Sequence, residues 1–177
     1  MTNDPNWNLR DVPTFALESP DVAPGATLPQ WARSGIAGAG GDDRSPELRW
    51  SGAPPETQSF VVTLFDPDAP TGSGWWHWAV CNLPATTTSL PQNAGDPDAG
   101  LMPAGAFTVP NELRLLRYMG AAPPPGHGPH RYFFTVSALD VPSLEIDANA
   151  TPGLLGFMIF DHAIARAQFH ALSETNE

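Results

Sequence analysis

The chain has 177 residues, which suits one domain with a substantial buried core. Its 8 basic and 19 acidic side chains give a formal net charge of −11, which argues against nucleic acid as a partner and against electrostatic binding to anionic membranes. Every basic residue is an arginine, so Schiff-base chemistry on lysine and a P-loop are excluded. A single cysteine, Cys81, rules out an intrachain disulfide.

The N-terminal sequence has neither the basic region nor the apolar core of a secretory signal. No segment approaches the ~18 apolar residues that a membrane-spanning helix needs. We therefore expect a cytoplasmic protein without stable membrane insertion, folded as one domain over residues 1–177.

The 21 prolines and 16 glycines are spread along the chain as turn residues, with short apolar runs between them. This pattern is typical of many short strands joined by long loops. Composition rich in β-branched and aromatic residues marks three strands, Gln58–Asp66, Trp76–Asn82 and Arg131–Leu139, and more weakly Thr14–Glu18 and Leu48–Ser51. The first and third have near-continuous apolar runs, as expected for central strands that are covered on both faces.

Three segments are predicted loops, namely Gly35–Ser45, Pro91–Gly105 and the proline-rich Ala121–Gly128. One helix is predicted, with Thr151 as N-cap and Pro152 in the first helical position. Apolar or small residues at helical spacing extend it from Leu154 as far as Arg166. The segment Ala167–Leu172 fits either a last strand or a continued helix.

Two carboxylates, Asp66 and Asp68, follow the first strong strand directly and are separated by Pro67. The prolines at 67 and 70 exclude a helix here, so both side chains stand at the end of a strand. A simple turn, in which the carboxylates accept backbone N–H groups, is the alternative to a functional site.

A histidine lies among tryptophans in the segment Trp75–Trp78. Alternation along a strand predicts that His77 and Trp75 share one face and that Trp76 and Trp78 share the other. If this strand pairs with the one before it, His77 approaches the two aspartates.

The third strong strand opens with His130, Arg131 and Tyr132. His130 and Tyr132 share a face, and Arg131 takes the other, where it is expected to hold Asp66 or Asp68 in place. Two aspartates, two histidines and a tyrosine from three strand ends form a polar cluster of the kind that binds ligands or catalyses reactions. Imidazole and phenol groups donate hydrogen bonds to oxyanions, so phosphate or carboxylate binding is expected.

These motifs resemble the two signature regions of the phosphatidylethanolamine-binding protein family. The resemblance is carried by DPDAP (66–70), WHWAVCNLP (76–84) and YMGAAPPPGHGPHRY (118–132), and by SPELRWSG, SALDV and LLGFMIFDHAIARA elsewhere in the chain. It covers nearly the whole chain and is similar to the bacterial, Raf-kinase-inhibitor-like branch, with actinobacterial members, notably the mycobacterial one, most alike.

The resemblance implies a mainly β fold, with a large central β-sheet, a smaller flanking sheet and a few short helices. It also implies an anion-binding pocket without a metal or organic cofactor. Bacterial members are commonly homodimers, so a homodimer is one expectation. The matching positions for ligand binding are Asp66, Asp68, Pro70, Trp75, His77, Ala122, Pro123, His130 and Tyr132.

Two departures from the family pattern bear on ligand selectivity: the C-terminal Ala171–Ser173, and the divergent segment Gly105–Leu116. His127 is predicted to be an exposed loop histidine, with a place at the pocket rim as the alternative. His162 is predicted to be structural, and Trp7, Trp31 and Trp50 are predicted core or dimer contacts.

Three functions stay open. The favoured one is binding of a small anionic or phosphate-bearing ligand of the phospholipid head-group type. The second is an acid–base enzyme, a cyclase, isomerase or hydrolase, that uses Asp66, His77 and His130. The third is a protein-interaction regulator of the kinase-inhibitor type.

Overall fold

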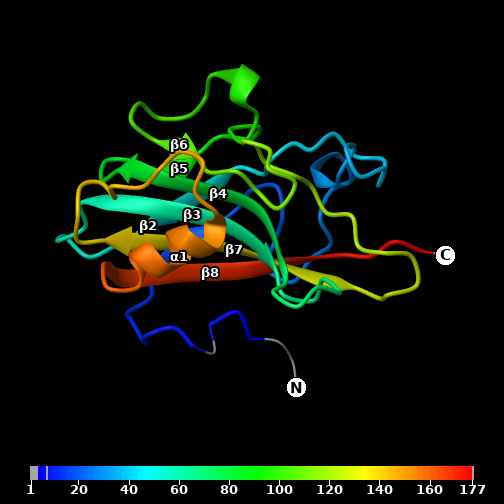
Figure 1. Cartoon of the computed structure of the whole chain (residues 1–177), viewed down its shortest axis with the longest axis horizontal. Helices are drawn as coiled ribbons and strands as arrows, with labels where there is room; N and C mark the ends of the chain where they lie inside the picture. The colour runs from blue at the N-terminus through cyan, green and yellow to red at the C-terminus, as the bar shows by residue number, and fades with distance from the viewer. Residues whose placement is uncertain (1–3, 7, 177) are drawn as a thin grey trace.

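The computed structural model describes residues 4–6 and 8–176, and it consists mainly of two antiparallel β-sheets (Figure 1). The large sheet has the strand order β6-β4-β3-β7-β8, and the small sheet has the order β1-β2-β5. The large sheet contains β3 (Ser59–Asp66), β4 (Trp75–Pro84), β6 (Phe107–Thr108), β7 (His130–Leu139) and β8 (Ala163–Ser173). The small sheet contains β1 (Ala16–Glu18), β2 (Leu48–Ser51) and β5 (Ser89–Leu90). The predicted mainly β fold is thereby confirmed.

All five predicted strands are present, with ends that differ by one or two residues. The predicted loops contain no strand or α-helix, although Pro97–Ala99 forms a short 3-10 helix within one of them, and Gln30–Ala32 forms another. The two-residue strands β5 and β6 were not predicted, because two residues are too few to show periodicity.

The main core lies between the two sheets. It is built from one face of β3, β4, β7 and β8 and from the small sheet, which contributes Leu48, Trp50 and Leu90. Trp50 is thus a core residue and Trp31 packs against this core, whereas Trp7 lies outside the described residues. A second, smaller core lies on the opposite face of the large sheet, where Leu155 of α1 (Pro152–Ile159) packs on Val61, Ala79 and Cys81. Figure 1 shows α1 lying over this face.

The predicted helix is correct at its start and wrong at its end. Thr151 caps it as expected, because its side chain accepts a hydrogen bond from the Leu154 backbone. The helix ends at Ile159, however, and the residues from Ala163 to Arg166 open β8 instead. Alternate residues of β8 are buried from Ala163 to Ser173, which gives a period of two, and pairing with β7 along its whole length outweighs the helical spacing of the local sequence.

A β-bulge in β4 changes the face on which Trp76 lies. Leu64 pairs with Trp78 but Phe65 pairs with Trp76, so the register shifts by one residue at His77. Trp78 lies in the main core, whereas Trp76 packs against Phe65 on the α1 side, with ring centroids 4.4 Å apart. The prediction that Trp76 and Trp78 share a face is therefore wrong, because an inserted residue reverses the alternation.

Within the described residues, no helix is both long enough and apolar enough to cross a membrane.

Candidate functional site

The ends of three neighbouring strands bring Asp66, His77 and His130 together. Asp66 ends β3, His130 opens β7 and His77 lies near the start of β4. These strands are antiparallel neighbours, so the end of β3 lies beside the starts of the other two. All three side chains are buried, with 2 to 4% of their surface exposed.

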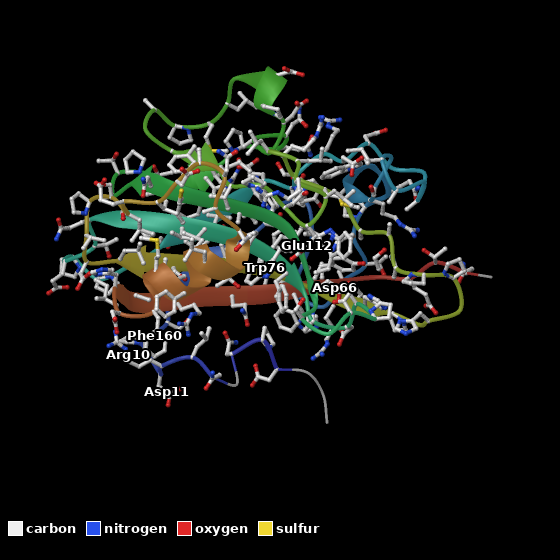
Figure 2. The ribbon with its side chains drawn as sticks, in the orientation of Figure 1. Arg10, Asp11, Asp66, Trp76, Glu112 and Phe160 are labelled. Carbon is white, nitrogen blue, oxygen red and sulfur yellow. The ribbon has the colours of Figure 1, made fainter. Side chains whose placement is uncertain are left out.

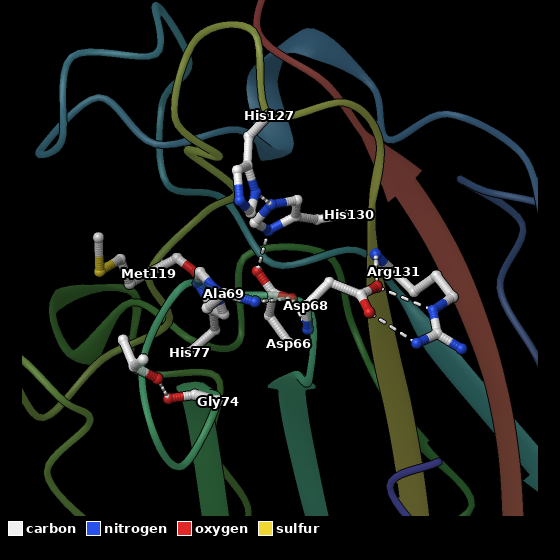
Figure 3. Close-up of polar contacts among 10 residues, drawn as sticks. Asp66, Asp68, Ala69, Gly74, His77, Met119, His127, His130 and Arg131 are labelled. Atoms are coloured by element: carbon white, nitrogen blue, oxygen red, sulfur yellow. Dashed lines mark hydrogen bonds and ion pairs between the residues drawn. The ribbon is translucent and has the colours of Figure 1, made fainter. Parts of the chain in front are cut away.

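Asp66 organises the site through both carboxylate oxygens. Oδ1 accepts hydrogen bonds from the backbone N–H groups of Asp68 (2.8 Å) and Ala69 (3.0 Å). Oδ2 accepts a hydrogen bond of 2.8 Å from Nδ1 of His130. The turn interpretation and the site interpretation of Asp66 therefore both hold: one oxygen shapes the loop and the other orients an imidazole (Figure 3).

His130 contacts a second histidine that sequence reasoning assigned to an exposed loop. Its Nε2 lies 2.6 Å from Nδ1 of His127, so Asp66, His130 and His127 form one continuous hydrogen-bonded chain. His127 comes from the proline-rich loop before β7, and Figure 3 shows its ring reaching down onto His130. Two features of the sequence could have predicted this contact, namely the stiffness of the proline-rich loop and the spacing of only three residues between His127 and His130.

Asp68 points away from this chain and pairs with Arg131. Its Oδ2 accepts hydrogen bonds from the Arg131 backbone (3.0 Å) and from Nε (2.8 Å), and Oδ1 accepts one from Nη2 (2.6 Å). Burial raises the pKa of Asp68, but the hydrogen bonds from Arg131 outweigh it and hold that pKa below its ordinary value. The structural role predicted for Arg131 is confirmed, with Asp68 as its partner.

His77 is held on the main-core side of the site. Its Nδ1 donates a hydrogen bond of 3.0 Å to the carbonyl oxygen of Met119, and its ring meets that of Tyr132 edge-on at 5.1 Å. Burial lowers the pKa of His77 to about 4, against a smaller opposing effect of the Asp66 charge. The imidazole is therefore neutral near pH 7, and with the proton on Nδ1 its Nε2 carries the lone pair.

We expect the free energy of unfolding to fall between pH 6.5 and 4 because of His77. In the unfolded chain this imidazole takes up its proton near its ordinary pKa of 6.5, but in the folded protein only near pH 4. The unfolded state therefore binds more protons, and acid favours it by about 3 kcal/mol over this range. Urea denaturation at several pH values gives a profile of unfolding free energy against pH. For His77→Asn, which keeps a donor for the Met119 carbonyl, this profile should fall by that amount less. Identical profiles would contradict a buried neutral imidazole.

Tyr132 and Trp75 also border the cluster of Asp66, His77 and His130. Burial, followed by the charge of Asp66, raises the pKa of Tyr132, so its phenol keeps its proton. Trp75 pairs with Asp66 across β3 and β4, and directly opposite residues project to the same face of a sheet. The Trp75 Nε1–H is buried and has no hydrogen-bond partner among the described residues.

The other predicted site residues lie at the edge of the cluster or beyond it. Pro70 is exposed in the loop after Asp68, Ala122 is half-buried and Pro123 is buried, and no hydrogen bond or ring contact of the described chain joins them to Asp66 or His130. Their part in ligand binding stays a prediction.

Asp43 is a residue that sequence reasoning missed. It is buried, and its carboxylate accepts hydrogen bonds from the backbone N–H groups of Gly35, Ile36 and Gly120. In this way it fixes the Met119–Ala121 segment that supports His77. Nothing in the local sequence distinguishes it from Asp42.

Cys81 lies in the second core, away from this cluster, and burial raises its pKa to about 12. It is a buried structural thiol. In the part of the chain that the structure describes, no three His, Cys, Asp or Glu side chains are placed to hold a metal ion.

The fold and the cluster define a two-sheet β protein whose central strands end in a buried Asp/His site. The phosphatidylethanolamine-binding protein family matches residues 18–174. The chain belongs to the phosphatidylethanolamine-binding protein family.

Two Escherichia coli proteins are similar to this chain in sequence. UPF0098 protein YbhB is 46% identical over 158 residues, which is 88% of this chain and 98% of that protein. UPF0098 protein YbcL is 46% identical over 137 residues, which is 77% of this chain and 75% of that protein.

Two solved structures are also similar. The crystal structure of E. coli YbcL, described as a new member of the mammalian PEBP family, has a TM-score of 0.88 at 42% identity and covers 91% of this chain and 98% of its own. The PEBP homologue CT736 from Chlamydia trachomatis has a TM-score of 0.76 at 27% identity, covering 92% and 98%. The similarity to an actinobacterial branch stays a prediction.

Proposed function

We propose that the chain binds a small anionic or phosphate-bearing ligand, of the phospholipid head-group type, at the Asp66–His130 end of the large sheet. The observation that supports this most is the continuous chain from Asp66 through His130 to His127. A buried carboxylate stabilises positive charge on the imidazole that it contacts. One proton taken up by the histidine pair gives it a charge that an anion can neutralise.

The outer histidine provides the donor for this anion. When the pair holds the extra proton, His130 donates one N–H to Asp66 and the other to His127, which leaves the His127 Nε2–H directed away from the pair. An anion is therefore expected to accept a hydrogen bond from the His127 Nε2–H.

Two further groups suit a phosphate. The unpartnered Trp75 Nε1–H beside Asp66 is a neutral donor for one phosphate oxygen. The Nε2 lone pair of the neutral His77 accepts a hydrogen bond from a protonated phosphate oxygen. Donors and one acceptor together favour a phosphate monoester over a simple carboxylate.

Calorimetric titration of phosphate, phosphoethanolamine and acetate tests this proposal. We expect saturable binding of the two phosphates, and about 10- to 100-fold weaker binding to His130→Ala, because the link between Asp66 and His127 is lost with its charge. His127→Ala should weaken binding about tenfold.

His162→Ala is the matched control, because His162 pairs with Asp140 at 3.0 Å on the surface and takes no part in the cluster. It should bind as the wild type does. No heat with any of the three anions, in folded protein, would overturn the proposal. Tighter binding to His127→Ala would show instead that this ring covers the site.

Acid–base catalysis is the second candidate, because Asp66 orients His130 as it would a general base. A similar fungal protein, the Phomoidride biosynthesis cluster protein B of Talaromyces stipitatus, is 32% identical over 140 residues, and its name places it in a biosynthetic cluster. Phosphorus NMR of phosphoethanolamine incubated with the protein separates the candidates, since binding alone leaves the spectrum of the recovered ligand unchanged. A kinase-inhibitor type of regulation, a homodimer and a cytoplasmic location stay predictions.

A further inference from the structure

A cavity of about 440 Å³ opens on the α1 face of the large sheet, and its lining contains none of Asp66, His77, His127 and His130. One wall is formed by α1 and the residues after it, another by residues 4–6 and Leu9 near the N-terminus, and the floor by β3, β7 and β8. Its volume lies within the range of small-molecule sites.

The floor of this cavity is polar, although it lies in the middle of the sheet. Thr63 of β3 pairs with Thr135 of β7, which pairs with Gln168 of β8, so three polar side chains form a row across three strands. Gln168 donates to the Thr135 hydroxyl (2.8 Å) and accepts from the Asn6 side chain (2.9 Å). The hydroxyls of Thr63 and Ser137 border the same cavity. Beside this row, the opposite face of the same strands is apolar, with Val62, Leu64, Phe134, Val136 and Phe169 in the main core, so this row is not explained by core packing.

An aromatic wall stands at the β3–β4 end of the cavity. Phe65 and Trp76 pack at 4.4 Å between ring centroids, and both line the cavity while remaining partly exposed. At the other end the rim is formed by Leu9 and Phe160, which are 40% and 44% exposed. Figure 2 shows Phe160 with Arg10 and Asp11 at that end, far from Trp76.

An arginine that has no ion-pair partner among the described residues lines the cavity at the Phe160 end. Arg166 is half-buried, makes no ion pair with any described carboxylate, and has one long hydrogen bond of 3.5 Å, to the Arg10 carbonyl. Arg10 and Asp11 are the charged groups around it. Asp4, the one described carboxylate of the lining, acts on Arg131 instead. Half-buried cations are usually paired, so this end of the cavity is suited to a carboxylate.

The distance between Arg166 and the Phe65–Trp76 pair sets the length of a ligand that contacts both. Arg166 pairs with Ser137, and Phe65 pairs with Phe133, four residues earlier on β7. At the usual rise along a strand this corresponds to roughly 13 Å.

We propose that this cavity is a second ligand site, which binds an aromatic carboxylic acid of about that length, with its carboxylate on Arg166 and its ring against Phe65 and Trp76. The Thr63–Thr135–Gln168 row then provides hydrogen bonds for polar substituents between the two ends. The site is separate from the Asp/His cluster and does not depend on the function proposed for it.

A backbone-amide NMR titration with 4-phenylbutyrate tests the proposal, because it reports both affinity and place. We expect saturable shifts at Thr135, Gly156 and Gln168. The neutral 4-phenyl-1-butanol and the variant Arg166→Gln should each give about tenfold weaker binding, since each removes the charge pair.

Two glycines of α1 provide a matched pair of variants. Gly156 lines the cavity, and a Cβ added there has no atom within 4 Å, so Gly156→Leu is expected to extend into the cavity. Gly153 is exposed on the same helix outside the lining, and Gly153→Leu makes the same change in composition. Both replace a poor helix former with a good one, so both should fold. Binding should be lost in Gly156→Leu and unchanged in Gly153→Leu.

Three outcomes would overturn the proposal. These are shifts that gather at His130 and Asp66 rather than at Thr135, equal affinity for the acid and the alcohol, and full binding by a folded Gly156→Leu protein.

Discussion

Replacing Asp66 with Asn is expected to weaken phosphate binding about 100-fold and to destabilise the protein by about 3 kcal/mol. The amide still accepts hydrogen bonds from the Asp68 and Ala69 backbone, so the loop keeps its shape. The negative charge that stabilises a protonated His130 is lost, and with it the positive charge that the anion needs. Calorimetry for binding and urea denaturation for stability measure the two effects separately.

Asp68→Asn is the control for this variant, because it removes the same charge only two residues away. Although Asp68 is among the residues predicted to bind the ligand, it is bonded to Arg131 and not to the histidines. Its loss should therefore cost about 2 kcal/mol of stability and leave phosphate binding within about twofold of the wild type. If the two variants lose the same affinity, net charge rather than the Asp66–His130 contact determines binding. If Asp66→Asn binds more tightly, the carboxylate opposes the anion.

Replacing Gly120 with Ala is expected to destabilise the fold by about 3 kcal/mol, or roughly 10 °C in Tm. An added Cβ would lie 2.2 Å from the carbonyl carbon of Arg33 and 2.5 Å from the Ala32 oxygen, and these are backbone atoms that cannot rotate away. The same displacement would move the Met119 carbonyl that accepts a hydrogen bond from His77. Calorimetric melting checks the stability.

Gly72→Ala is the matched glycine variant. Gly72 lies in the exposed β3–β4 loop, and an added Cβ there has no atom within 4 Å. Its Tm should stay within about 2 °C of the wild type, as expected for a change of at most about 0.5 kcal/mol. A Gly120→Ala protein as stable as this control would show that the segment 32–34 is free to move apart from it.

The strands that form the large sheet could be predicted because their signal is local. Continuous runs of β-branched and aromatic residues in β3 and β7 specify buried strands whatever surrounds them. The helix start was equally local, since a threonine cap and a proline act within one turn. The end of that helix could not be predicted from the local sequence, because β8 is stabilised along its whole length by pairing with β7, a partner more than twenty residues earlier.

The same division holds for the site. The residue types of Asp66, His77 and His130 and their places at strand ends follow from the sequence, as does the pairing of Arg131 with one of the two aspartates. Which aspartate holds His130 and which holds Arg131 was decided by the direction of each side chain in the folded loop. The contact between His127 and His130 depends on how the proline loop folds back over β7.

The sequence by itself determined the mainly β fold, the residues of the polar cluster and the family, because propensity, turn chemistry and motif spacing act over a few residues. Only the tertiary structure decided the bulge that turns Trp76 away from Trp78, the buried Asp43 that fixes the support of His77, and the cavity beneath α1 that Arg166 lines. Each of these results from packing between segments that are far apart in the chain, and no local pattern encodes such contacts.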